Sequence, residues 1–293
     1  FRGAARGICG AELTERPPAD LVLCRLCFYT GGMTDLVPAS DHIHSIPAGI
    51  PFATTLATGL VALATTPQNL AAATVLVPSR RAALALRAAF LEIKGPGASL
   101  LPRIDPIGDV DEESPDILGM AADGGALPPA MDPVRRQLWL ARLLAGFRIG
   151  DSALAPAQTV RLAESLARLM DSLCNADATP EQLVELLPDR FSRHWQDILK
   201  LLTILIDRWP AILEEEGVLD PADRRNRLIR LRCEAWRRDP PAGLVVVAGS
   251  TVTFAATREL IACVAGLPNG HVVLPGLDSA AAEHWQQIRH DTG

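Results

Sequence analysis

The stretch Ser45–Leu56 reads SIPAGIPFATTL and separates a short alternating run, HIHSI at residues 42–46, from an Ala/Leu-rich run that ends at Ala64. Alternation predicts a strand, and the longer apolar run, which contains no proline, predicts a helix. In an α/β protein, the tight loop between a strand and the next helix is where phosphates bind. Whether PAGIP, residues 47–51, is a phosphate loop, a degenerate one or neither therefore bears on both fold and function.

A working phosphate loop of the form G-x-x-x-x-G-K-[ST] supplies backbone amides and a lysine to the phosphates and a hydroxyl to Mg²⁺. Laid over IPAGIPFATT, residues 46–55, this pattern leaves Gly49 as the glycine that remains in the loop. Pro51 replaces the second glycine, which removes an amide donor and fixes φ. Phe52 replaces the lysine and Ala53 the hydroxyl. We therefore expect the turn to form, but we do not expect it to be a functional nucleotide-binding site.

A later strand points the same way. Nucleotide hydrolysis on such a sheet needs acidic residues at the end of a later strand, where they hold Mg²⁺ and position water. The strand expected within residues 243–250 ends Val247-Ala248-Gly249-Ser250, with no Asp or Glu. We therefore expect no ATP hydrolysis and assign no catalytic residue.

Other units of strand and helix lie on either side of a long middle segment. Strands are expected at 73–78, 99–104, 243–250 and 270–278, and helices at 79–93 and 253–267. Ser79 is a good N-cap for the first of these helices. Because the strands are short and apolar without alternation, they favour a parallel sheet covered on both faces.

The middle segment, residues 131–239, is predicted to be helical. Asp132-Pro133, Thr179-Pro180 and Asp220-Pro221 each place a capping side chain before a proline at the first helical position. The expected helices cover 133–147, 154–176, 180–217 with breaks near Pro188 and Pro210, and 221–237. Four tryptophans fall in this segment and are expected in its core: Trp139, Trp195, Trp209 and Trp236.

This pattern divides the chain into four parts. Residues 33–130 are the first part of an α/β domain, 131–239 a helical insertion, and 240–293 the continued and truncated α/β domain. Residues 1–32 have no clear period, the chain opens on Phe1, and the first methionine is Met33. We therefore expect 1–32 to be a leader that is either foreign to the native protein or disordered.

Composition limits the function further. The formal charge of −6 gives no global positive field, so contact with nucleic acid would have to be local. Six cysteines in 293 residues suit a reducing cytoplasm, and Cys24-Arg-Leu-Cys27 has no partner pair with which to bind a metal. The uncharged stretch Ile46–Ala64 is long enough to cross a membrane. Its prolines, its threonines and the lack of flanking Lys or Arg argue against that alternative.

Seven stretches, in this order, carry a resemblance to a known family: SIPAGIPFATTLA, VLVPSRRAALALRAAF, LLPRIDPIGDVDE, RFSRHWQDILKLLTILIDRWPAIL, DPADRRNRLI, VVVAGSTVTFAATRELI and HVVLPGLD. From about His42 to Trp285 the chain resembles the N-terminal part of the AddB subunit of AddAB helicase-nucleases, in its alphaproteobacterial form. The resemblance implies a RecA-like, superfamily 1 helicase-like parallel sheet with a helical insertion.

The same resemblance implies a role in homologous recombination, in the repair of double-strand DNA breaks. The motor of AddB would be silent, and an AddA-like helicase-nuclease subunit would form the heterodimer and carry the active motor. The nuclease domain of the family, with its four-cysteine iron-sulfur cluster and Mg²⁺, is expected to be absent from this chain. The chain itself is then expected to hold no cofactor and no metal.

By resemblance to superfamily 1 helicases, the loop Pro78–Arg81 would touch the backbone of single-stranded DNA through Ser79, Arg80 and Arg81. The amides and dipole of a helix N-terminus also favour phosphate. The alternative is an ordinary capped helix with solvated arginines. Arg103 is a second candidate contact, although pairing with Asp105 or Asp109 is the favoured interpretation.

Three further interpretations stay open. The arginine run of residues 224–238 is expected to be a solvated face paired with Asp220, Asp223 and Glu234, although it could also track phosphates or face a subunit. The acidic run 109–114 is expected to be a solvated loop. The competing functions are an atypical P-loop ATPase that uses Lys94, one of two lysines, and a stand-alone α/β interaction module without DNA affinity.

Overall fold

A computed structural model describes residues 24–25, 42–95, 97–108, 127–149, 152–185, 201–250 and 254–276. Its main sheet has the strand order β1-β2-β8-β7-β3-β4. The strands are β1 (Cys24–Arg25), β2 (Ile43–Ile46), β3 (Thr74–Val77), β4 (Arg103–Pro106), β7 (Val245–Ala248) and β8 (Gly270–Pro275). β1 is antiparallel to β2, and the other five strands are parallel. The expected parallel α/β sheet is confirmed.

Helices pack on both faces of this sheet. One core contains residues of α1 (Phe52–Ala64), α2 (Pro67–Ala71) and α3 (Arg80–Lys94), and the other contains residues of α10 (Pro221–Arg238) and α11 (Ala255–Ala265). β3 shows why its sequence is apolar throughout: Val75 and Val77 enter the first core, and Leu76 enters the second. A strand buried on both faces needs no polar side.

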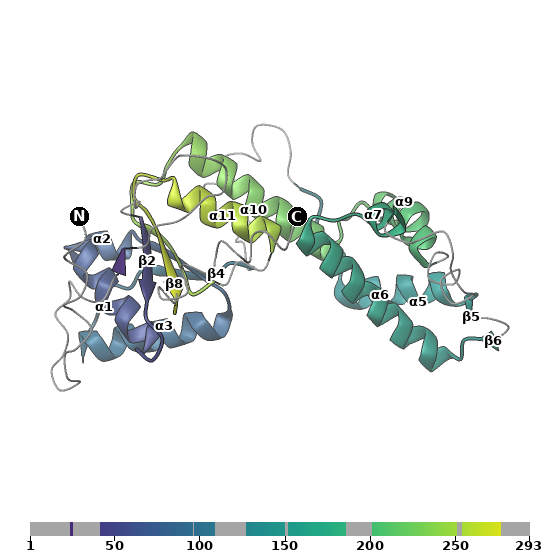
Figure 1. The fold of residues 1–293 in the computed structure, drawn as a ribbon, viewed down its shortest axis with the longest axis horizontal. Coiled ribbons are helices and arrows are strands. Elements are labelled where there is room, and N and C mark those ends of the chain that lie inside the picture. Colours follow the sequence, from purple (N-terminus) through teal and green to yellow (C-terminus); the bar gives the residue numbers. More distant parts are fainter. Residues whose placement is uncertain are drawn as a thin grey trace, which may run out of the picture.

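A separate group of helices lies between β4 and β7 in the sequence. It comprises α5 (Pro133–Leu144), α6 (Pro156–Ala176), α7 (Pro180–Glu185), the π-helical turn η2 (Ile204–Arg208) and α9 (Trp209–Glu216), with the strand pair β5 (Arg148–Ile149) and β6 (Ser152–Ala153). Figure 1 shows this group extending away from the main sheet. Its own core includes Leu140, Leu144, Leu166 and Trp209, and α6 contacts α10 and α11.

The helix starts predicted from Asp-Pro and Thr-Pro pairs are confirmed at Pro133, Pro180 and Pro221. Asp132 Oδ1 accepts hydrogen bonds from the amides of Val134 and Arg135 at 2.9 and 3.0 Å. The ends differ slightly from expectation, since α5 stops at Leu144 and α6 begins at Pro156. Of the tryptophans, Trp209 and Trp236 are buried and Trp139 is half-buried against the helical core.

One predicted strand is shifted, and one helix was not predicted. The strand expected at 99–104 lies at Arg103–Pro106, where the Arg103 amide donates to Ala73 O at 2.9 Å; the preceding Pro102 has no amide to donate. No element was predicted for residues 65–69, TTPQN, of which the last three begin α2. There the Thr66 hydroxyl accepts from the Asn69 amide at 3.2 Å.

Within the described ranges, no helix is long and apolar enough to cross a membrane. The stretch Ile46–Ala64 instead forms the end of β2, a loop and α1. Several predicted features fall outside the described residues: the leader apart from Cys24–Arg25, together with Cys27, Pro188, Trp195, the acidic run 109–114 and residues 277–293.

Candidate functional site

The candidate loops follow the carboxyl ends of parallel strands, so they share one edge of the sheet. From β3 the chain passes through α3 to β4 on one side, whereas from β7 it passes through α11 to β8 on the other. Ligands of open α/β sheets bind in the crevice at such a switch point. Here the switch point lies between β3 and β7, beside Pro78 and Gly249.

The loop Pro47–Pro51 forms a tight turn after β2. The Ile50 amide donates to Pro47 O at 3.4 Å, and Gly49 has a φ of +86°, which favours glycine. Pro51 is the N-cap residue of α1, and no side chain caps that helix. The predicted turn therefore forms, with a proline where a phosphate loop would present an amide.

The side chain of Phe52 lies at the switch point. A Cβ atom built on Gly249 would lie 3.2 Å from Phe52 Cε1 and 3.7 Å from Pro78 Cδ. Phe52 also packs against the core beneath α1 and α3. An aromatic ring thus occupies space beside the ends of β3 and β7, close to where a nucleotide phosphate would have to enter.

The N-terminus of α3 lies at the same edge. The Ser79 hydroxyl accepts from the Ala82 amide at 3.2 Å, which confirms the predicted N-cap. Arg80 and Arg81 are exposed, and the first turn of α3 contains no acidic residue. Two cations therefore lie beside helix amides that themselves attract anions.

Arg103 does not join this group. Its Nε lies 2.6 Å from Asp105 Oδ2, so the favoured pairing with Asp105 is confirmed. Arg103 is the register partner of Thr74, at the amino end of β3. At about 3.3 Å per residue, the five residues from Thr74 to Ser79 separate Arg103 from the start of α3 by about 16 Å along the strands.

The arginine run of α10 is only in part the solvated face that was expected. Arg227, Arg237 and Arg238 are exposed, whereas Arg224 and Arg232 are 8% and 4% exposed. Arg224 Nε donates to Pro128 O at 2.7 Å, and Arg230 pairs with Asp177 at 2.9 Å and Glu259 at 3.1 Å. α10 packs between the sheet and the helical group, so these arginines hold neighbouring elements together. Asp223, one of the acidic partners expected for the run, pairs with Arg227 at 2.8 Å.

Sequence reasoning missed an aromatic and cationic pair near the carboxyl edge. Phe254, the N-cap residue of α11, is 39% exposed. The guanidinium carbon of Arg225 lies 5.6 Å from the centre of its ring. A Cβ built on Gly108, just after β4, would lie 3.9 Å from Arg225 Cδ. Phe254 lies in the sequence between a buried strand and the helix that follows it. This position could have indicated that its ring lies near the carboxyl edge.

Lys94 lies far from the loop. α3 has 15 residues and starts at the carboxyl edge. At about 1.5 Å per residue, Lys94 is about 21 Å along the helix from Arg80, toward the opposite edge of the sheet. This placement removes the basis for an ATPase that draws its lysine from α3.

No group of three or more His, Cys, Asp or Glu side chains within the described ranges could hold a metal ion. No protein-family model matches the chain, and a search of curated proteins finds no match. The described residues form an α/β protein with a five-stranded parallel sheet, a tight turn after β2 and exposed arginines at the same edge.

Proposed function

We propose that this chain is a helicase-like scaffold that binds single-stranded DNA without hydrolysing ATP. In the AddB-type complex that the sequence resembles, it would serve double-strand break repair in the cytoplasm and dock an AddA-like subunit with an active motor. The RecA-like fold and the role of residues 131–239 as a helical insertion belong to the same proposal.

The observation that carries the proposal is the position of Phe52. Its ring lies beside Gly249 and Pro78 at the switch point, where a nucleotide-binding sheet would keep space for phosphates. Pro51 offers no amide, and the end of β7 offers no carboxylate for Mg²⁺. These features support a sheet that keeps the shape of a nucleotide-binding domain without its chemistry.

The exposed arginines at the start of α3 support the DNA-binding part. Ser79 caps α3, and Arg80 and Arg81 are the first residues of that helix, so their side chains lie at the same end as its first-turn amides. A net-negative protein binds nucleic acid only through such a local surface. Phe254, with Arg225 over its ring, adds an aromatic face on which a base could stack at the same edge.

The test is the affinity of the chain for a fluorescent single-stranded oligonucleotide, measured by anisotropy over a range of salt. We expect the double variant Arg80→Ala/Arg81→Ala to bind about tenfold more weakly at 0.1 M salt. We also expect the slope of log K against log salt to fall by about 1.4, or about 0.7 for each phosphate that an arginine no longer neutralises.

The matched control is Arg237→Ala/Arg238→Ala. These two arginines are also adjacent and exposed, but they end α10 near the amino edge of the sheet. The control removes the same charge and should bind like the wild type. An equally weakened affinity in both double variants would show a general charge effect. An absence of salt-sensitive binding in the wild type would instead favour a protein-docking module without DNA affinity.

A further inference from the structure

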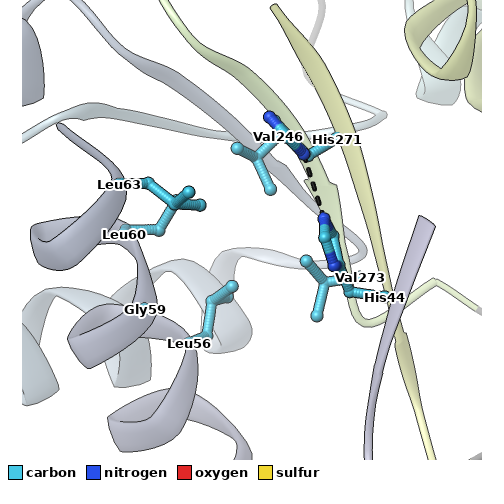
Figure 2. A pocket seen from close by; sticks show the side chains of 8 residues that line it. All are labelled: His44, Leu56, Gly59, Leu60, Leu63, Val246, His271 and Val273. Atoms are coloured by element: carbon cyan, nitrogen blue, oxygen red, sulfur yellow. Dashed lines mark hydrogen bonds between the residues drawn. The ribbon is translucent and has the colours of Figure 1, made fainter. Parts of the chain in front are cut away.

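Three histidines lie on one face of two neighbouring strands. His42 and His44 flank the start of β2, and His271 lies in β8. His44 Nε2 lies 3.0 Å from His271 Nδ1 (Figure 2). The ring centres of His42 and His271 are 5.4 Å apart, and those of His44 and His271 are 5.2 Å apart. Only the pairing of β2 with β8 brings this histidine cluster together, because the two strands are far apart in the sequence.

The surroundings of the histidine cluster are apolar. His44 and His271 line a small pocket with Leu56, Leu60 and Leu63 of α1 (Figure 2). The remaining lining residues are Gly59, Val246 and Val273. α1 contains no charged residue, so the pocket-lining residues named here offer no carboxylate to a protonated imidazole.

The hydrogen bond between His44 Nε2 and His271 Nδ1 needs one hydrogen between the two nitrogens. Only one of the two rings can therefore be protonated while this bond is kept, because protonation of both would place two N–H groups face to face. His42 Nδ1 donates to Gly270 O at 2.6 Å, which leaves Nε2 as its site for a further proton. Burial and the neighbouring histidines, His44 and then His42, lower the pKa of His271 to about 4.

We propose that the histidine cluster is an acid-sensitive clamp that holds β2, and the loop it carries, against β8. When β2 separates from β8, the histidine side chains bind protons that they do not accept in the paired strands. Falling pH therefore favours the separation of β2 from β8. The stabilisation that neutral His271 gives to the pairing of β2 with β8 is fully present above its ordinary pKa of 6.5. This stabilisation is lost as pH falls toward 4. For one proton, the opening constant rises by at most about tenfold per pH unit.

The position of β2 makes a local opening feasible. β2 lies at one end of the five parallel strands, and β8 is its one parallel neighbour among the described strands. Two bonds at its ends are those from the Val272 amide to His42 O and from the Gly276 amide to Ile46 O, both 2.7 Å. Opening would free the turn Pro47–Pro51 at the carboxyl edge. The inference does not depend on DNA binding.

Hydrogen exchange of the whole chain, followed by mass spectrometry at pH 7.5 and pH 5.0, tests the clamp. After correction for the intrinsic effect of pH, protection in peptides covering 42–50 should fall at least fivefold more than in peptides covering β3. An equal change in both regions would mean general acid unfolding, and no change in either would mean that the clamp is not acid-sensitive. Either result overturns the proposal.

Variants separate the clamp from other acid effects. His271→Leu should flatten the pH dependence of exchange over residues 42–50, and His44→Gln serves the same purpose if the first variant does not fold. The control His284→Leu changes a histidine outside the described residues and should keep the wild-type pH dependence. A wild-type pH dependence in a folded His271→Leu or His44→Gln protein contradicts the proposal.

Discussion

At the scale of single residues, the contact between Phe52 and Gly249 is the feature on which the proposed loss of nucleotide binding depends. Gly249 has a φ of +75°, and its missing side chain leaves room for the Phe52 ring. A side chain at position 249 would crowd the Phe52 ring, so the ring can take this place only beside a glycine. The large side chain at the lysine position needs a glycine at the end of β7.

Replacing this glycine should therefore destabilise the protein. Gly249→Ala combines a left-handed backbone conformation with a Cβ 3.2 Å from Phe52 Cε1, so we expect the free energy of unfolding to fall by about 2 kcal/mol. The measurement is the midpoint of urea unfolding. In the control Gly146→Ala the new Cβ meets nothing within 4 Å, and stability should change by less than about 0.5 kcal/mol. Equal effects would refute the role given to Phe52.

Local chemistry can be predicted from the sequence at this scale, but long-range contacts cannot. Capping by Ser79 and Asp132 and the turn at Gly49 depend on neighbouring residues alone, and they were predicted correctly. The contact of Phe52 with Gly249 and the histidine cluster depend on which strands are neighbours. A single sequence contains no direct signal for that order.

At the scale of elements, α10 is held by a buried polar network rather than by solvated charges. Arg136 of α5 is buried, with Nε 3.0 Å from Asp220 Oδ2 and one terminal nitrogen 2.9 Å from Asp171 Oδ1. Asp220 in turn caps α10 through the Ala222 amide and lies 3.3 Å from the indole nitrogen of Trp209. Burial raises the pKa of Asp220, and the charge of Arg136 opposes that rise.

Removing Arg136 should leave a buried carboxylate without its cation. We expect Arg136→Met to lower the free energy of unfolding by about 3 kcal/mol at pH 7.5. Without the guanidinium, the folded pKa of Asp220 rises further above its unfolded value. In this variant the ionised Asp220 therefore lowers the free energy of unfolding most at high pH and less as the carboxylate is protonated. The loss of stability relative to the wild type should be smaller at pH 5 than at pH 7.5. Urea unfolding at the two pH values measures both effects.

The control for this prediction is Arg168→Met. Arg168 pairs with Glu164 at 2.7 Å, but both side chains are more than half exposed. Such a surface pair contributes at most about 1 kcal/mol, and we expect no dependence of the destabilisation on pH. A destabilisation in Arg136→Met that stays constant between pH 7.5 and pH 5 would contradict the role assigned to Asp220.

The prediction of elements failed where tertiary contacts override local pattern. Charge density in α10 suggested a solvated helix, yet the long side chains of Arg224 and Arg232 are buried. Arginine tolerates this because its stem packs against apolar surface while its head finds carbonyls, carboxylates or an aromatic ring. The shift of β4 to Arg103–Pro106 follows from pairing with β3, which the local sequence does not specify.

At the scale of the whole molecule, the parallel sheet gathers loops from distant parts of the sequence at one edge. Apolar strands without alternation were enough to predict a parallel sheet with two covered faces. They were not enough to predict that β7 lies between β3 and β8, and this order brings Gly249 beside Pro78 and Phe52. The group of helices between β4 and β7 was predicted from its caps, but not its packing on α10.

The proposed function requires that the carboxyl edge binds DNA without nucleotide control. The most direct test is the affinity of the unmodified chain for single-stranded DNA, measured over a range of salt with and without MgATP. We predict a linear fall of log K with log salt that is the same in both conditions, together with no ATP hydrolysis. An affinity that changes with MgATP, or DNA-stimulated hydrolysis, would contradict the claim.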